Sequence, residues 1–119
     1  MDDLTQRALL FDFYGSLLTK KQREIYDLYF QQDLSLGEIG ELQNVSRTAI
    51  YDLVKRTEGA LHHYEERLGL VRKYVAGQAI LAVLRTQLES LQKQDSDRRQ
   101  QEEAWGKVYE LLQKLEESW

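Results

Sequence analysis

Residues 36–56 read LGEIGELQNVSRTAIYDLVKR, and this order of apolar, small and polar residues predicts two helices joined by a short turn. Ser35 and Glu38 form a capping box, in which each side chain accepts a hydrogen bond from a backbone N–H at the start of a helix. Asn44 tolerates the left-handed conformation of a turn, and Ser46 suits the start of the next helix. The stretch therefore predicts a helix-turn-helix, with its first helix over 36–42.

The packing of this stretch is also suggested by its sequence. Gly40 is small at the point where the following helix has to cross closely. Ile39 and Leu42 are expected to face inward, and Val45 is expected to fill the corner between the two helices.

The second helix of the stretch is predicted to begin near Arg47 and to run to about Leu68. Its apolar stripe recurs at spacings of three and four through Ile50, Leu53, Val54, Thr57, Leu61, Tyr64 and Leu68. Gly59 allows a break, because a glycine inside a helix costs about 1 kcal/mol relative to alanine. Gly69 is the favoured end of the helix.

Two helices are predicted before this stretch. The first carries an apolar stripe and ends near Gly15, and the second begins with a capping box formed by Thr19 and Gln22. The outer face of the second helix carries Lys20, Lys21, Arg23 and Glu24. Its end carries an aromatic cluster that belongs to a core or to a subunit interface, namely Tyr26, Tyr29 and Phe30.

The chain beyond residue 70 has a different pattern. Apolar residues fall on the a and d positions of a heptad repeat, first at Tyr74, Gly77, Leu81, Leu84, Leu88 and Leu91, and then at Trp105, Val108, Leu112, Leu115 and Trp119. The polar stretch QKQDSD between them predicts a tight connection and hence an αα-hairpin. Two domains follow: a helix-turn-helix domain over 1–70 and amphipathic helices over 71–119 for oligomerisation or partner docking.

Composition places the whole chain in the all-α class, as an N-terminal helix bundle containing the helix-turn-helix followed by a long helical hairpin or coiled-coil tail. The 119 residues include no proline and seven glycines, and helix-forming residues dominate. The net charge of −4 excludes a dedicated DNA-compacting protein, because neutralising phosphates requires a strongly basic surface. Any contact with nucleic acid must use a local basic face.

A candidate contact face lies on the second helix of the helix-turn-helix, which enters the major groove in DNA-binding proteins of this shape. Its outward positions are predicted to be Arg47, Thr48, Tyr51, Asp52 and Lys55. Arginine can contact guanine or a phosphate, and threonine and tyrosine can contact phosphate or a thymine methyl. Lys55 and Arg56 suit the backbone further along, whereas Asp52 either contacts a cytosine amino group or repels phosphate.

Other readings of the same residues stay open. The helix pair can be a plain structural unit with a solvated face, since shape does not imply function. His62 and His63 point about 100° apart on a helix and are read as solvated. No catalytic residue, metal site or cofactor is predicted, and an enzyme is not expected. A cytoplasmic location without membrane insertion is expected, because no apolar run approaches the length of a membrane span.

The residues from Leu4 to about Tyr74 closely resemble the YlxM-like family of small bacterial proteins. The resemblance is carried by LLTKKQ at 17–22, SLGEIGE at 35–41, NVSRTAIYD at 44–52 and KRTE at 55–58. Residues 35–56 are also similar to the DNA-reading helix-turn-helix in region four of bacterial sigma factors. Two positions depart from that pattern: Gly40 replaces a usual alanine, and Gln43 stands where an apolar residue is common.

The resemblance implies an all-helical DNA-binding protein encoded beside the GTPase of the signal recognition particle, and an accessory or regulatory role there. It places nucleic-acid-binding residues at Ser46, Arg47, Thr48, Tyr51, Lys55 and Arg56. The expected partners are DNA or the particle's RNA. The alternative is a protein-interaction module that docks on the GTPase through its C-terminal helices. A homodimer formed through the tail fits either function.

Overall fold

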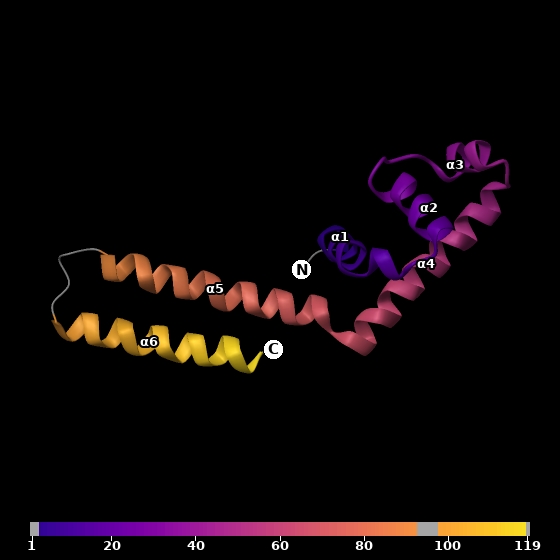
Figure 1. The fold of residues 1–119 in the computed structure, drawn as a ribbon. Coiled ribbons are helices and arrows are strands. Elements are labelled where there is room, and N and C mark those ends of the chain that lie inside the picture. Colours follow the sequence, from indigo (N-terminus) through magenta and orange to yellow (C-terminus); the bar gives the residue numbers. More distant parts are fainter. Residues whose placement is uncertain (1–2, 93–97, 119) are drawn as a thin grey trace. The chain divides into compact units, whose positions relative to one another are not determined.

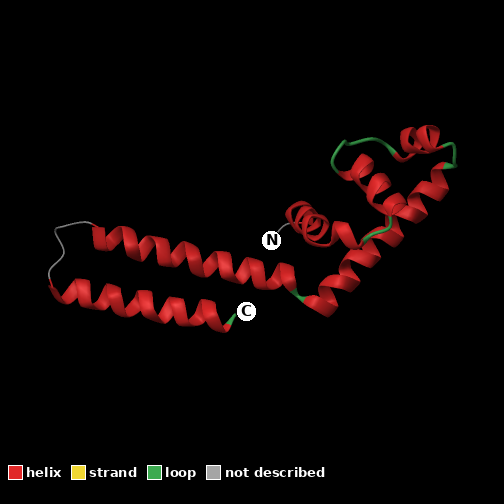
Figure 2. Cartoon of the chain, in the orientation of Figure 1, coloured by secondary structure: helices red, strands yellow, loops and turns green. Residues whose placement is uncertain are grey.

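The structure is a computed structural model that describes residues 3–92 and 98–118. Every regular element in these two ranges is helical (Figure 2), so the predicted all-α class is confirmed. The chain divides into two compact units, Met1–Val71 and Arg72–Trp119. Within the described ranges, no helix is both long and apolar enough to cross a membrane.

The first unit contains four α-helices, three of which pack on the fourth (Figure 1). In chain order they are α1 (Asp3–Tyr14), the 3₁₀ turn η1 (Gly15–Leu17), α2 (Lys20–Phe30), α3 (Leu36–Gln43) and α4 (Arg47–Leu68). Both predicted capping boxes are present. Thr19 and Gln22 start α2, and Ser35 and Glu38 start α3. These contacts fix where α2 and α3 begin.

The core of this unit lies between α4 and the three helices that cover it. Each of its large apolar side chains is at most 6% exposed, and burying one fully contributes about 1.5–3 kcal/mol. The core consists of Leu10, Tyr14, Leu18, Ile25, Tyr26, Ile39, Ile50, Val54, Leu61 and Val71. Most of the predicted stripe of α4 is therefore confirmed.

The helix α4 is continuous through Gly59, so the alternative of a break there is wrong. Thr57 is buried in the middle of the stripe, and its hydroxyl donates to the Leu53 carbonyl oxygen at 2.8 Å, within the helix. The helix ends at Gly69, which adopts the left-handed conformation with φ 65°, as predicted.

The prediction that Leu68 faces inward is wrong, because its side chain is 48% exposed. The helix α1, which covers this end of α4, stops at Tyr14. The Tyr14 ring, at the end of α1, lies 6.0 Å from the Tyr64 ring. Leu68 lies about one helical turn beyond Tyr64 and therefore beyond the part of α4 that α1 covers.

Tyr14 joins α1 to the end of α4 through buried hydrogen bonds. Its hydroxyl donates to Glu65 Oε1 at 2.6 Å and accepts from the Leu70 backbone N–H at 3.0 Å. The same Glu65 oxygen accepts from the Val71 N–H at 2.9 Å. Two side chains thus satisfy backbone donors that a helix beginning at Leu70 leaves free. Burial, with the Glu65 hydrogen bond next, raises the pKa of Tyr14 above its usual 10.0.

Tyr26 belongs to the core of the unit and lies inside the predicted aromatic cluster. Its ring stacks on Phe30 with centroids 5.7 Å apart and lies 5.4 Å from Phe11. The Tyr26 hydroxyl is buried and finds no hydrogen-bond partner among the described residues. Burial, reinforced by the negative charge of Glu58, raises the pKa of Tyr26 to about 12.

The second unit is formed by α5 (Leu70–Gln92), which begins in the first unit, and α6 (Arg98–Glu117). The two helices run side by side in opposite directions, which confirms the predicted αα-hairpin (Figure 1). Apart from the backbone of Gln92, the predicted connection QKQDSD lies outside the described residues, and so does Trp119.

Candidate nucleic-acid interface

The turn between α3 and α4 is closed by backbone hydrogen bonds. Asn44 adopts the left-handed conformation, with φ 60° and ψ 40°, as predicted. Its N–H donates to the Glu41 carbonyl oxygen at 3.3 Å, and the Val45 N–H donates to that of Gly40 at 2.9 Å. This pair of bonds is a Schellman motif. Ser46 then caps α4, because its Oγ accepts from the Ala49 N–H at 3.1 Å.

Gly40 is the point of closest approach between α3 and the turn. A Cβ atom placed on Gly40 would lie 2.8 Å from the Val45 carbonyl oxygen and 3.5 Å from the Arg47 nitrogen. The predicted need for a small residue here is therefore confirmed. A larger residue at position 40 would collide with the backbone of the turn and of Arg47, the first residue of α4.

Two predictions about the apolar residues near this turn are wrong. Leu42 is 65% exposed and Val45 is 46% exposed. The inward face of α3 is formed by Leu36, Ile39, Gly40 and Gln43, and Leu42 points about 100° away from its centre. The corner that Val45 was expected to fill is occupied by backbone atoms, so its side chain projects outward.

All six residues predicted to bind nucleic acid are exposed. They occupy the N-terminal cap and the first three turns of α4 and are Ser46, Arg47, Thr48, Tyr51, Lys55 and Arg56. In the same turns, Ile50 and Val54 are buried. The geometry therefore separates an anchoring face from an outward face in the way a recognition helix requires.

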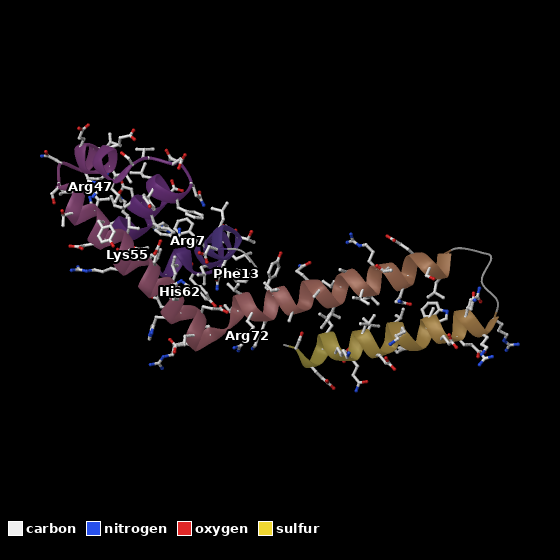
Figure 3. The ribbon with its side chains drawn as sticks, turned by 180° about the vertical axis from the view of Figure 1, so that it is seen from behind. Arg7, Phe13, Arg47, Lys55, His62 and Arg72 are labelled. Atoms are coloured by element: carbon white, nitrogen blue, oxygen red, sulfur yellow. The ribbon has the colours of Figure 1, made fainter. Side chains whose placement is uncertain are left out.

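Four of these residues, Arg47, Thr48, Tyr51 and Lys55, share one side of α4. Figure 3 shows Arg47 at the beginning of the helix and Lys55 about two turns further along. The Lys55 ammonium lies 5.6 Å from the centroid of the Tyr51 ring, which is within the range of a cation–π contact. Arg56 is turned about 100° from Lys55 and lies at the edge of this face.

Lys21 is a further basic residue that the sequence did not connect with the turn. Its ammonium donates a hydrogen bond to the side-chain oxygen of Gln43, the last residue of α3. Sequence reasoning placed Lys21 only on the outer face of its own helix. Because 22 positions separate it from Gln43, no local pattern revealed the contact. The contact places the Lys21 charge at the end of α3, next to the turn.

Negative charge opposes nucleic-acid binding at this face. Asp52 is exposed on the outward side of α4, as predicted. Residues 1–71 contain eight Lys and Arg against twelve Asp and Glu, so this half carries the whole net charge of −4. The positive charge near the turn therefore comes from individual residues, Lys21, Arg47 and Lys55, within a unit of negative net charge.

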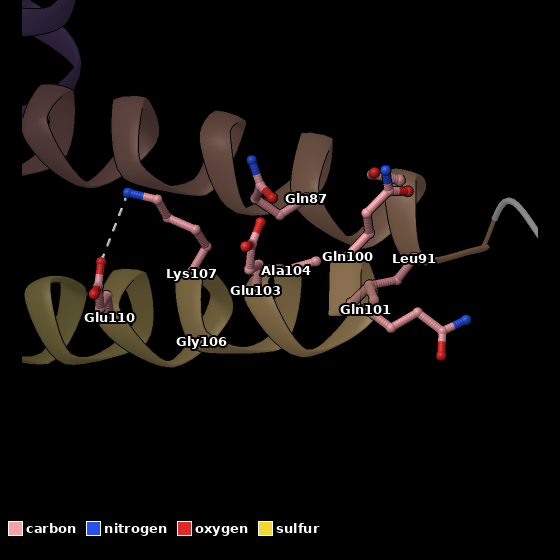
Figure 4. A pocket seen from close by; sticks show the side chains of 10 residues that line it. Gln87, Leu91, Gln100, Gln101, Glu103, Ala104, Gly106, Lys107 and Glu110 are labelled. Carbon is pink, nitrogen blue, oxygen red and sulfur yellow. Dashed lines mark ion pairs between the residues drawn. The ribbon is translucent and has the colours of Figure 1, made fainter. Parts of the chain in front are cut away.

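Two other regions are candidates for a ligand site, namely the adjacent histidines of α4 and a cleft between α5 and α6. His62 and His63 are both exposed, and in the described part of the chain no cluster of three His, Asp or Glu side chains is suited to hold a metal ion. A polar cleft of about 760 Å³ lies between α5 and α6, and its lining includes Gln87, Glu103, Lys107 and Glu110 (Figure 4).

Comparison with known proteins matches residues 1–103 to the family model described as "UPF0122: Putative helix-turn-helix protein, YlxM / p13 like". A UPF0122 protein of Bacillus cereus (strain AH187) is 44% identical over 116 residues, which cover 98% of this chain and 99% of that protein.

Two UPF0122 proteins from other bacteria are more similar over a shorter stretch. That of Caldanaerobacter subterraneus subsp. tengcongensis is 55% identical over 73 residues, and that of Thermoanaerobacter sp. (strain X514) is 53% identical over 73 residues. In both cases the match covers 61% of this chain and 62% of the relative, which is less than two thirds of the relative's length.

Proposed function

Since the chain belongs to the UPF0122 family of YlxM/p13-like helix-turn-helix proteins, we propose that it binds nucleic acid through α4. One observation carries the proposal. Arg47, Thr48, Tyr51 and Lys55 are exposed on a helix that Ile50 and Val54 anchor in the core.

Each of these residues has a distinct role in the proposed complex. Arg47 and Thr48 follow the Ser46 cap, where free backbone N–H groups and the helix dipole favour a phosphate or a base edge. Tyr51 and Lys55 continue the contact along the helix, and Arg56 contacts the phosphate backbone beside them. Lys21 adds a phosphate contact from α2 and thereby fixes how the turn approaches the strand.

We propose further that this binding serves the bacterial signal recognition particle, as an accessory or regulatory function. The resemblance of residues 4–74 to YlxM-like proteins supports this part of the proposal. The ligand is then either duplex DNA or the RNA of the particle. We propose no catalytic role, since the contact face consists of groups that bind rather than react.

The test is a fluorescence anisotropy titration with labelled duplex DNA and, separately, with the particle's RNA. The full chain is compared with a double variant, Arg47→Ala with Lys55→Ala. The matched control is Arg98→Ala with Arg99→Ala, which removes the same charge from exposed positions of α6.

We expect the Arg47 and Lys55 variant to bind about tenfold or more weakly, because a base contact contributes about 1–3 kcal/mol. If both residues contact phosphates of duplex DNA, the slope of log K against log salt also falls by about 2. The control should bind like the unmodified chain. The proposal fails if neither ligand binds at low salt, or if both variants lose the same affinity.

A second candidate function is a protein-interaction module that docks on the particle's GTPase through the C-terminal helices. The concentration of the net charge of −4 in residues 1–71 favours it, because that charge weakens contact with phosphates. Capture from a lysate, with and without nuclease, separates the two functions. A GTPase that stays bound after nuclease treatment supports the second function, and its loss together with the nucleic acid supports the first.

A further inference from the structure

The hairpin of α5 and α6 buries little apolar surface by itself. Val108 is the one large apolar side chain of residues 72–92 and 98–118 that is buried. Seven others are between 36% and 68% exposed, namely Tyr74, Leu81, Val83, Leu88, Trp105, Tyr109 and Leu112. The first unit also exposes large apolar side chains, such as Leu4 and Leu42, but it buries ten, whereas the described part of the second unit buries one.

The exposed apolar residues of α5 form a row beside the row that faces α6. Gly77 is buried and Leu84 is half-buried, so these two mark the direction of α6. Tyr74, Leu81 and Leu88 recur every seven residues and are turned by about 60° from that direction. They therefore form one continuous edge of the helix.

The helix α6 repeats this arrangement. Val108 is buried and Leu115 is half-buried, whereas Trp105 and Leu112 lie three positions before them and are exposed. Viewed from its own N-terminus, each helix thus carries its exposed row clockwise of its buried row. Since the two helices run in opposite directions, the two exposed rows lie on the same side of the hairpin.

We call this side the apolar face and define it by Tyr74, Leu81, Leu88, Trp105, Tyr109 and Leu112. None of these six residues is charged, and a groove of about 340 Å³ runs along α5 on this side, lined by Leu81, Leu84 and Leu88 together with Gln78, Ala82 and Arg85. The opposite side is polar. The cleft there is lined mainly by charged and amide side chains, with Leu91 and Ala104 among them, and Lys107 Nζ lies 3.8 Å from Glu110 Oε2 (Figure 4).

The size of the apolar face matches what a stable dimer needs. Its three aromatic side chains are 36%, 50% and 68% exposed, and each would bury about 150–250 Å² in full. With the three leucines, each about 40% exposed, the face offers about 500 Å² of apolar surface. A standard interface buries about 800 Å² on each partner, of which roughly 60% is apolar.

We propose that the apolar face binds the same face of a second copy of this chain, so that two hairpins form a four-helix bundle. An interface between identical copies must be self-complementary about a twofold axis, and an apolar centre with Arg85 at its edge meets this condition. Residues 72–119 contain eight Lys and Arg and eight Asp and Glu, so two hairpins approach without net repulsion. The proposal does not depend on nucleic-acid binding by α4.

The first test is sedimentation equilibrium of the full chain from micromolar to hundreds of micromolar. The variant Leu81→Gln with Leu112→Gln removes an apolar side chain from each helix and keeps helix-forming residues. The matched control is Val83→Gln, because Val83 is 48% exposed but lies on another side of α5. We expect the unmodified chain and the control to be dimers. The dissociation constant of the dimer should be at least about 100-fold higher for the double variant.

A second measurement tests the proposal even if the double variant fails to fold. The chain contains no cysteine, so single cysteines can carry spin labels without further changes. A label at Gln78→Cys, beside the groove, should show a shorter distance to its counterpart in the other copy than a label at Glu103→Cys on the polar side. The proposal is overturned by a monomer at all concentrations, by a dimer that the double variant leaves intact, or by a shorter distance from the polar side. A pure chain that stays monomeric and assembles only with another protein also overturns it.

Discussion

Replacing Gly40 by alanine tests how closely α3 packs on the turn that follows it. The new Cβ atom would lie 2.8 Å from the Val45 carbonyl oxygen, which is backbone and cannot rotate away. Gly59→Ala is the matched control, because its Cβ would meet nothing within 4 Å. Both glycines lie inside helices, so alanine brings each variant the same gain in helix propensity, about 1 kcal/mol.

The difference between the two variants therefore isolates the cost of the contact. Overpacking of this kind costs roughly 1–3 kcal/mol. We expect Gly59→Ala to raise the free energy of unfolding by up to about 1 kcal/mol and Gly40→Ala to leave it unchanged or lower it by up to about 2 kcal/mol. In a domain of this size each kcal/mol shifts Tm by about 4–8 °C.

The assay is urea and thermal unfolding of the full chain, followed by helical circular dichroism. Equal unfolding midpoints for the two variants would refute the reasoning, because the carbonyl of Val45 would then leave room for a methyl group. A loss of stability in Gly59→Ala would refute it as well, since that position would then have an unrecognised neighbour.

Three further predictions concern charge and buried hydroxyl groups. Asp52→Asn should tighten binding of duplex DNA or RNA severalfold in the anisotropy titration, because it removes a negative charge from the outward side of α4; unchanged affinity would place Asp52 outside the contact. In urea titrations at pH 7, Tyr14→Phe should lower the free energy of unfolding by about 1.5–3 kcal/mol, because it removes a hydrogen bond to the Glu65 carboxylate. Tyr26→Phe should leave the free energy of unfolding unchanged or raise it by about 1 kcal/mol, because the Tyr26 hydroxyl is buried without a hydrogen-bond partner among the described residues. Tyr26 has a pKa of about 12 when folded and about 10 when unfolded, so the unfolded chain releases this proton first and stability falls as pH rises from 10 to 12. At pH 11 this loss is about 1.4 kcal/mol and should be absent from Tyr26→Phe; parallel pH profiles of the two proteins would contradict it.

Local sequence signals predicted the ends of the helices well. Each capping box, at Thr19 and at Ser35, joins residues only three positions apart. The left-handed conformation of Asn44 concerns a single residue. Both signals can therefore be recognised in a short stretch of sequence. The family was recognised in the same way, from short stretches such as NVSRTAIYD at 44–52, and the match over residues 1–103 confirms it.

The direction of side chains across the fold was harder to predict. Leu42 follows Ile39 by three positions and matches an inward pattern, yet an eight-residue helix has few positions that mark its buried side. The contacts of Lys21 with Gln43 and of Tyr14 with Glu65 join residues 22 and 51 positions apart. In the tail, a heptad repeat does not indicate which of its two apolar rows faces the neighbouring helix.

The predicted contact residues of α4 are exposed as expected, and their binding of nucleic acid stays a prediction. Lys55 is exposed because it lies about 100° or more from Ile50 and Val54 around the helix, whereas Arg47 lies close to the direction of Val54 and is exposed in the first turn of α4. What the face touches depends on a ligand, and no periodicity in the chain encodes that ligand.

The hydrogen bonds around Tyr14 have a consequence for the order in which the chain folds. Starting a helix is the unfavourable step, because several residues are fixed before the first hydrogen bond repays the lost entropy. For α5 the first two backbone donors, at Leu70 and Val71, are held by side chains from α1 and α4. The start of α5 is thus held by residues that precede it in the chain, and the Leu70 amide should exchange with solvent when α1 detaches, whereas the Val71 amide stays bonded to Glu65 of α4.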